Sequence, residues 1–170
     1  VGMCLMPIRI TVTYDVFDSL NDREETVLIV GRKDRLKETP WRETLGVSQE
    51  TWQAILKRTQ GGDGGATATT WLGKRKLILG VLPEAGSRHK TPTRSWAIPE
   101  MARRVRGRAD AAIIILVDRP EYATACASAA VRGLPLYKQT SGKDTKQTIR
   151  ICAFSAEGPI ADPKIQATMD

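Results

Sequence analysis

The sequence predicts an α/β fold in which helices cover both faces of a mixed β-sheet. Residues 109–117 form an apolar run, interrupted only by Asp110, that is typical of a central strand buried on both faces. Helical and strand patterns alternate after this run, which favours parallel strands joined by crossover helices. A tight turn at residues 73–75 separates two further strand patterns, and such a hairpin adds an antiparallel pair.

The first part of the chain predicts two strands. Residues 7–14 alternate apolar and polar side chains, as in a half-buried strand, and residues 18–22 form a polar turn. Residues 26–31 are a β-branched run that fits a strand covered on both faces.

A helix and a hairpin are expected next. Residues 32–46 are polar and predict a loop with at most a short helical turn. Ser48 is a good N-cap for a helix that extends to about Arg58. The glycine-rich residues 61–65 predict a flexible connector, and the hairpin strands then follow as residues 67–72 and 76–82.

The second half predicts helices between strands. Residues 84–93 form a polar loop, and residues 95–105 place apolar side chains on one helical stripe. After the central strand, a helix runs from Pro120 to Gly133, where small residues allow close packing on the sheet. The remaining elements are predicted as a short strand at 134–137, a turn at 141–143, a strand at 148–154 and a helix capped by Asp162.

The chain is basic, with a formal net charge of +7 from 26 basic and 19 acidic residues. The basic residues fall in short clusters at 32–35, 74–76, 103–104 and 106–108, and they form no continuous tail. We therefore expect most of them to solvate exposed faces, although a basic surface also suits a nucleic acid or an acidic partner.

The three cysteines, Cys4, Cys126 and Cys152, are too widely spaced for a disulfide framework or a zinc knuckle. Apolar neighbours predict that Cys126 and Cys152 are buried and reduced, which favours a cytoplasmic location. The apolar start of the chain lacks the features of a signal peptide. The longest apolar run is far shorter than the roughly 20 residues of a membrane helix, so no membrane association is expected.

No pattern predicts a catalytic, cofactor-binding or metal-binding residue. The single histidine, His89, lies between two cations that disfavour a metal. Neither Cys126 nor Ser141 has a basic partner in a recognisable motif. Residues 141–143 (Ser-Gly-Lys) lack the preceding glycine of a phosphate loop, and residues 61–65 are followed by no helix.

The four tryptophans are expected to anchor the core at element ends, in preference to stacking on bases. They are Trp41, Trp52, Trp71 and Trp96.

Three stretches of the sequence together carry a resemblance to one known family. The first is VLIVGRKDRLKETPW followed by ETWQAIL, and the second is SRHKTPTRSWAIPEMARRV. The most specific is IIILVDRPEYATACASAAVRGLPLYKQTSGK, in which a buried strand and a small-residue helix lead to LPLY and a TSGK turn. Together, over residues 26–143, the stretches resemble the N-terminal domain of the leucyl aminopeptidase (cytosol aminopeptidase) family, in particular its probable-aminopeptidase-like branch.

This resemblance implies a macro-domain-like three-layer sandwich at residues 1–158. Residues 159–170 would start a connector helix to a C-terminal catalytic domain. In this family that domain binds two divalent metals, zinc or manganese, and removes N-terminal amino acids from peptides as a hexamer. The family's catalytic signature, an NTDAEGR segment, does not occur in these 170 residues. The domain itself is therefore expected to be non-catalytic and to support assembly and access to the active site.

Two alternatives stay open at this stage. Macro-like folds bind ADP-ribose, and the basic surface would suit nucleic acid through contacts to phosphates. The chain would instead be a stand-alone structural protein if no enzyme accompanied it.

Overall fold

The structure is a computed structural model of the chain. The residues that it describes are 5–7, 9–12, 24–38, 41–84, 92–107, 109–134, 137–139 and 147–160. The strands are β1 (Leu5–Pro7), β2 (Arg9–Val12), β3 (Glu24–Gly31), β4 (Ala66–Leu72), β5 (Arg75–Val81), β6 (Asp110–Leu116), β7 (Tyr137–Gln139), β8 (Thr148–Ser155) and β9 (Gly158–Pro159). The helices are α1 (Lys33–Lys37), α2 (Trp41–Thr44), α3 (Gln49–Arg58), α4 (Ile98–Ala102) and α5 (Ala123–Gly133). Short 3₁₀ turns flank α4 as η1 (Ser95–Ala97) and η2 (Arg103–Val105), and η3 (Pro120–Tyr122) precedes α5.

A mixed sheet with the strand order β2-β8-β6-β3-β5-β4 forms the middle layer. Its inner strands run parallel, with β3 between β5 and β6. The hairpin strand β4 pairs antiparallel with β5 at one edge, and β9 adds an antiparallel pair to β8. The prediction of a mixed sheet is confirmed, and β1 and β7 pair with each other outside it.

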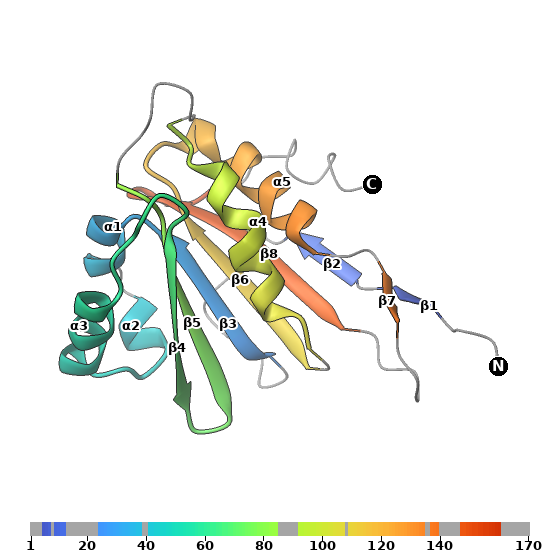
Figure 1. Cartoon of the computed structure of the whole chain (residues 1–170), viewed down its shortest axis with the longest axis horizontal. Helices are drawn as coiled ribbons and strands as arrows, with labels where there is room; N and C mark the ends of the chain where they lie inside the picture. The colour runs from blue at the N-terminus through green and yellow to red at the C-terminus, as the bar shows by residue number, and fades with distance from the viewer. Residues whose placement is uncertain are drawn as a thin grey trace.

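Both faces of this sheet are buried under helices, as the apolar runs predicted. On one face, Leu28 and Ile113 pack in a core with residues of α4 and α5, among them Ile98. On the other face, Ile29 packs in a second core with Trp52 of α3 and other residues of the α1–α3 segment. Figure 1 shows α4 and α5 side by side over the strands and α1–α3 grouped near β3, β4 and β5. Because side chains alternate along a strand, each inner strand supplies both cores.

The contact between α4 and α5 depends on a glycine. Gly133, the last residue of α5, is buried against the backbone of Pro99 in α4. A Cβ at this position would overlap the Pro99 carbonyl oxygen and lie 2.7 Å from its Cα. Only glycine therefore lets the two helices approach this closely.

Helix α3 begins as its sequence predicts. The Ser48 side chain accepts a hydrogen bond from the backbone N–H of Thr51 at 3.2 Å, which satisfies one free donor of the first turn. The buried Trp52 donates its indole N–H to the carbonyl of Leu36 at 2.9 Å. This bond ties α3 to the end of α1.

Three local predictions require correction, and one gains a neighbouring strand. Residues 32–46 contain two short helices, α1 and α2, because packing of Leu36 against the second core stabilises turns too short to persist alone. The strand predicted at 7–14 is present as β2 (Arg9–Val12), and a separate strand with a different partner, β1 (Leu5–Pro7), lies just before it. The short strand predicted at 134–137 lies at Tyr137–Gln139. Trp71, predicted to anchor the core, is 64% exposed on the edge strand β4.

The remaining predictions are either confirmed or lie outside the described residues. The hairpin, the helix over 95–105 with its 3₁₀ ends, the central strand, the helix ending at Gly133 and the strand at 148–154 are all present. The turns at 18–22 and 141–143, His89 and the helix capped by Asp162 lie outside the described residues.

We expect the substitution Gly133→Ala to lower the free energy of unfolding by about 2 kcal/mol or more, since the added methyl forces α4 and α5 apart. Urea unfolding followed by tryptophan fluorescence measures this loss. Gly62→Ala is the matched control, because Gly62 is exposed and a Cβ there meets nothing within 4 Å. Its effect should stay within about 0.5 kcal/mol, and equal losses in the two variants would contradict the close-packing argument.

Candidate functional site

The crevice between the carboxyl ends of β3 and β6 is the first place to look for a ligand site. The chain leaves β3 toward α1 on one face of the sheet and leaves β6 toward α5 on the other. In open α/β sheets, ligands bind where neighbouring strands diverge in this way. Arg32 directly follows β3, and Asp118 follows β6 by two residues.

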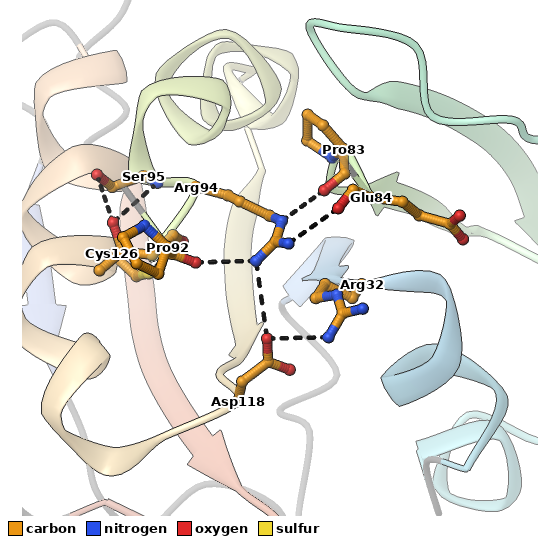
Figure 2. A network of polar contacts seen from close by, with 9 residues as sticks. Arg32, Pro83, Glu84, Pro92, Arg94, Ser95, Asp118 and Cys126 are labelled. Carbon is orange, nitrogen blue, oxygen red and sulfur yellow. Dashed lines mark hydrogen bonds and ion pairs between the residues drawn. The ribbon is translucent and has the colours of Figure 1, made fainter. Parts of the chain in front are cut away.

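Arg94 closes this crevice. It precedes η1 with a left-handed backbone (φ 54°), and its side chain is only 14% exposed. The guanidinium group donates to the carbonyls of Pro83 at 2.5 Å, Pro92 at 2.9 Å and Glu84 at 3.0 Å. Figure 2 shows the group between these carbonyls, with one nitrogen directed at Asp118. Because the three acceptors belong to two segments, Arg94 binds the end of β5 to the start of α4.

Asp118 lies between two cations. Its Oδ2 accepts a hydrogen bond from Arg32 Nη1 at 3.3 Å and lies 3.9 Å from Arg94 Nη1. The exposed fractions of the Arg32 and Asp118 side chains are 33% and 27%, so solvent screens the ion pairs in part. The network therefore links the ends of β3, β5 and β6 through one carboxylate.

The space left in the crevice is small. The cavity among Arg32, Arg94, Asp118 and Cys126 has a volume of about 10 Å³. This volume is that of one water, whereas sites for drug-sized ligands occupy about 300–1,000 Å³. Within the described residues, this geometry does not support the alternative of an ADP-ribose site at the strand ends.

Cys126 lies under the network and has the properties of a core residue. Its Sγ donates to the Thr93 carbonyl at 3.5 Å. Burial, with a smaller contribution from Asp118, raises the pKa of the Cys126 thiol to about 12. Cys152 donates to the Ile113 carbonyl at 3.2 Å, and complete burial raises its pKa as well. The prediction that both are buried, reduced residues is confirmed, and neither forms a thiolate nucleophile near neutral pH.

The other residues considered from the sequence are not brought to this site. Gly65, at the end of the glycine cluster, donates its N–H to Gly62 and packs against Met101 and Val81. Trp52 is buried as predicted, and the side chain of Trp96 packs on the first core. The side chain of Trp41 and residues 141–143 lie outside the described residues.

Two searches of the described part of the chain gave negative results. There, no three or more His, Cys, Asp or Glu side chains come together as potential metal ligands. None of its helices has the length and apolar character needed to cross a bilayer.

Sequence patterns did not predict Arg32, Arg94 and Asp118 as site residues. Arg32 and Asp118 carried a usable signal, because each is the charged residue near the end of a predicted parallel strand. Arg94 carried none, since its partners are backbone carbonyls whose positions follow from the fold.

Comparisons with known proteins agree with this architecture. The model of the family described as M17 aminopeptidase N-terminal domain 2 matches residues 25–143. No curated protein matches the chain in sequence.

Solved structures of leucine aminopeptidases share the fold. The Caenorhabditis elegans leucine aminopeptidase is 16% identical with a TM-score of 0.66, over 86% of this chain and 31% of that one. The Leishmania major leucyl aminopeptidase is 17% identical with a TM-score of 0.64, over 89% and 30%. An M17 aminopeptidase of Trypanosoma brucei is 16% identical with a TM-score of 0.55, over 96% and 35%. The chain thus spans about a third of the length of these structures.

Replacing Arg94 with alanine should lower the free energy of unfolding by about 2–3 kcal/mol, because three carbonyls, of which that of Pro83 is part-buried, lose a charged donor. Arg94→Lys should restore little of this, since an ammonium group does not match the planar fork of the guanidinium group. Chemical denaturation measures both values.

The matched control for Arg94 is Arg103→Ala. Arg103 pairs with Glu100 at 2.9 Å, but both side chains are more than half exposed. We expect a change within about 0.5 kcal/mol. If Arg94→Ala were as mild as this control, the network would not hold the crevice closed.

The burial of the two thiols predicts slow reaction with a thiol reagent in the native state. In a Cys4→Ser variant, Cys126 and Cys152 should react with dithionitrobenzoate at pH 8 at least about a hundredfold more slowly in the native state than in denaturant. Because both folded pKa values are raised above the ordinary value of 9.0, the unfolded state loses these protons first. The free energy of unfolding should therefore fall as the pH rises from about 9 toward 12. Rapid labelling of the native protein would contradict the burial.

Proposed function

Because the chain belongs to the M17 aminopeptidase N-terminal domain 2 family, we propose that it is the non-catalytic N-terminal domain of a larger, metal-dependent leucyl aminopeptidase. The observation that carries this proposal is the family match over residues 25–143. The shared fold, which covers about a third of each leucine aminopeptidase structure, supports it.

The proposal includes a division of labour within the longer protein. Residues 1–158 form this domain, and residues 159–170 begin the connector to the catalytic domain. That second domain would hold two divalent cations, zinc or manganese, which would supply Lewis-acid chemistry for hydrolysis of the first peptide bond of a substrate. The longer protein is a cytoplasmic hexamer that removes N-terminal amino acids from peptides.

We further propose that this domain supports assembly and access to the catalytic centre. Its described crevice at the strand ends is closed by Arg94, and this favours a role as a rigid body over a role as a nucleotide receptor. Two apolar cores and a closed crevice give the domain a defined shape with which to restrict approach to a neighbouring active site.

The 170-residue chain should not hydrolyse leucine-p-nitroanilide in the presence of Mn²⁺ or Zn²⁺. Turnover that a chelator abolishes would overturn the non-catalytic assignment. The longer protein that contains the domain should show chelator-sensitive turnover with the same substrate.

The role in assembly and access has a separate test. Deleting the domain from the longer protein should change the number of subunits per particle in light scattering, or change kcat/KM for long peptides more than for a dipeptide. An unchanged number of subunits together with unchanged selectivity for peptide length would contradict both roles.

A further inference from the structure

A second cavity, separate from the closed crevice, lies among α1, α2 and α3. Its volume is about 560 Å³, which falls within the range of established ligand sites. We call it the helical pocket, and the described residues that line it come from these three helices. It is therefore large enough to hold several side chains of a partner.

Helical spacing builds the long wall of this pocket. The residues that α3 contributes to the lining are Gln49, Trp52, Gln53, Leu56 and Lys57. Residues at these intervals share one face of a helix, and the stretch from the first to the last rises about 12 Å. The pocket is thus an elongated groove along α3.

The charged side chains among the described lining residues of the groove are all positive. Lys33 and Lys37 contribute from α1, Arg42 from α2 and Lys57 from α3. No carboxylate is among the described lining residues.

Nearby carboxylates compensate this charge only in part. The Nζ of Lys37 lies 3.8 Å from Asp34 Oδ1, and both side chains are more than half exposed. The Nη2 of Arg42 lies 3.2 Å from Oε1 of the exposed Glu43. The exposed pair of Lys37 and Asp34 is worth little and yields readily to a partner's carboxylates. The Arg42 side chain is 25% exposed and also donates to the Val47 carbonyl at 3.1 Å, so it is held in place beside the groove. In the described part of the chain, Lys33 and Lys57 have no ion pair. The groove is therefore complementary to a negatively charged occupant.

The floor and the polar wall indicate which kind of anion fits. Trp52 and Leu56 are 2% exposed and form an apolar floor. Gln49 and Gln53 present amides that both donate and accept, as peptide groups do. Cations spread along a groove match several separated charges better than one compact phosphate.

A single-stranded nucleic acid fits this groove less well. Such ligands stack their bases on open aromatic faces. Trp52 is the aromatic residue among the described lining residues, and it is buried with its indole N–H bonded to Leu36. Among its described lining residues, the pocket thus combines positive charge with apolar surface and has no open aromatic face.

We propose that the helical pocket binds an acidic peptide segment of a partner protein, in which aspartate or glutamate residues flank an apolar side chain. The carboxylates pair with the four cations, the apolar side chain reaches the floor, and the glutamine amides bond the peptide backbone. This site is independent of the proposed aminopeptidase role, since neither the family match nor the closed crevice enters the argument.

Fluorescence anisotropy of the whole chain tests the proposal. The probe is a short fluorescein-labelled peptide that alternates Asp-Glu pairs with single leucines, and its neutral counterpart carries Asn-Gln pairs. The acidic probe should bind, and raising the salt from about 50 to about 200 mM should weaken binding. The neutral peptide should bind at least about tenfold more weakly.

Two charge-reversed double variants locate the binding. Lys37→Glu with Lys57→Glu alters the pocket, and we expect it to weaken binding of the acidic probe at least about tenfold. Lys74→Glu with Arg104→Glu lowers the net charge equally at exposed positions outside the pocket, and its effect should stay below about twofold. Circular dichroism and urea unfolding check that both variants fold.

Four results would overturn the proposal. They are no binding of the acidic probe, equal binding of the neutral peptide, equal weakening by the two double variants, and tighter binding of a single-stranded oligonucleotide of the same charge that the pocket variant abolishes. Activity measurements on the longer enzyme do not bear on any of these readouts.

Discussion

The burial of β3 and β6 on both faces is the constraint from which the other features follow. A parallel pair of strands needs crossover connections, and these place α1–α3 on one face and α4–α5 on the other. The same connections leave the strand ends diverging, and the carbonyls of the loops there need donors. Arg94 supplies three of these donor N–H groups and closes the crevice in which a ligand would otherwise bind.

The surface formed by α1, α2 and α3 differs from the closed crevice, because it leaves an open, positively charged groove. Helix α3 is amphipathic, so its inner face completes the second core while the edge of that face and the neighbouring α1 and α2 leave a groove. Lysine and arginine stems cover apolar surface there and keep their charges in solvent. The domain thus separates a rigid interior, suited to a scaffold, from a charged exterior groove suited to recognition.

Sequence patterns predicted the parts of the fold that local chemistry controls. The run at 109–117, the Ser48 cap and the hairpin turn each carry a strong local signal, and the family resemblance agreed with the later match. Helices α1 and α2 were missed because four or five residues carry too little periodicity to stand out. Trp71 was placed in the core because a pattern of residue types does not tell an edge strand from an inner one. The closed crevice and the helical pocket combine distant residues, so only the fold reveals them.

Strands that are apolar on both faces carry little information about register. Sliding β6 by one residue would exchange one apolar surface for another, so burial alone discriminates poorly between the two alignments. Polar contacts at both ends of the strands remove this ambiguity. At the amino end, Arg150 of β8 contacts the buried Glu24 of β3 at 2.6 Å, across the width of β6. At the carboxyl end, Asp118 meets Arg32 and Arg94. These ionic contacts favour the observed register, which uniformly apolar strands alone would not specify. In a sheet whose register had shifted, a charged side chain at each end would lose its partner.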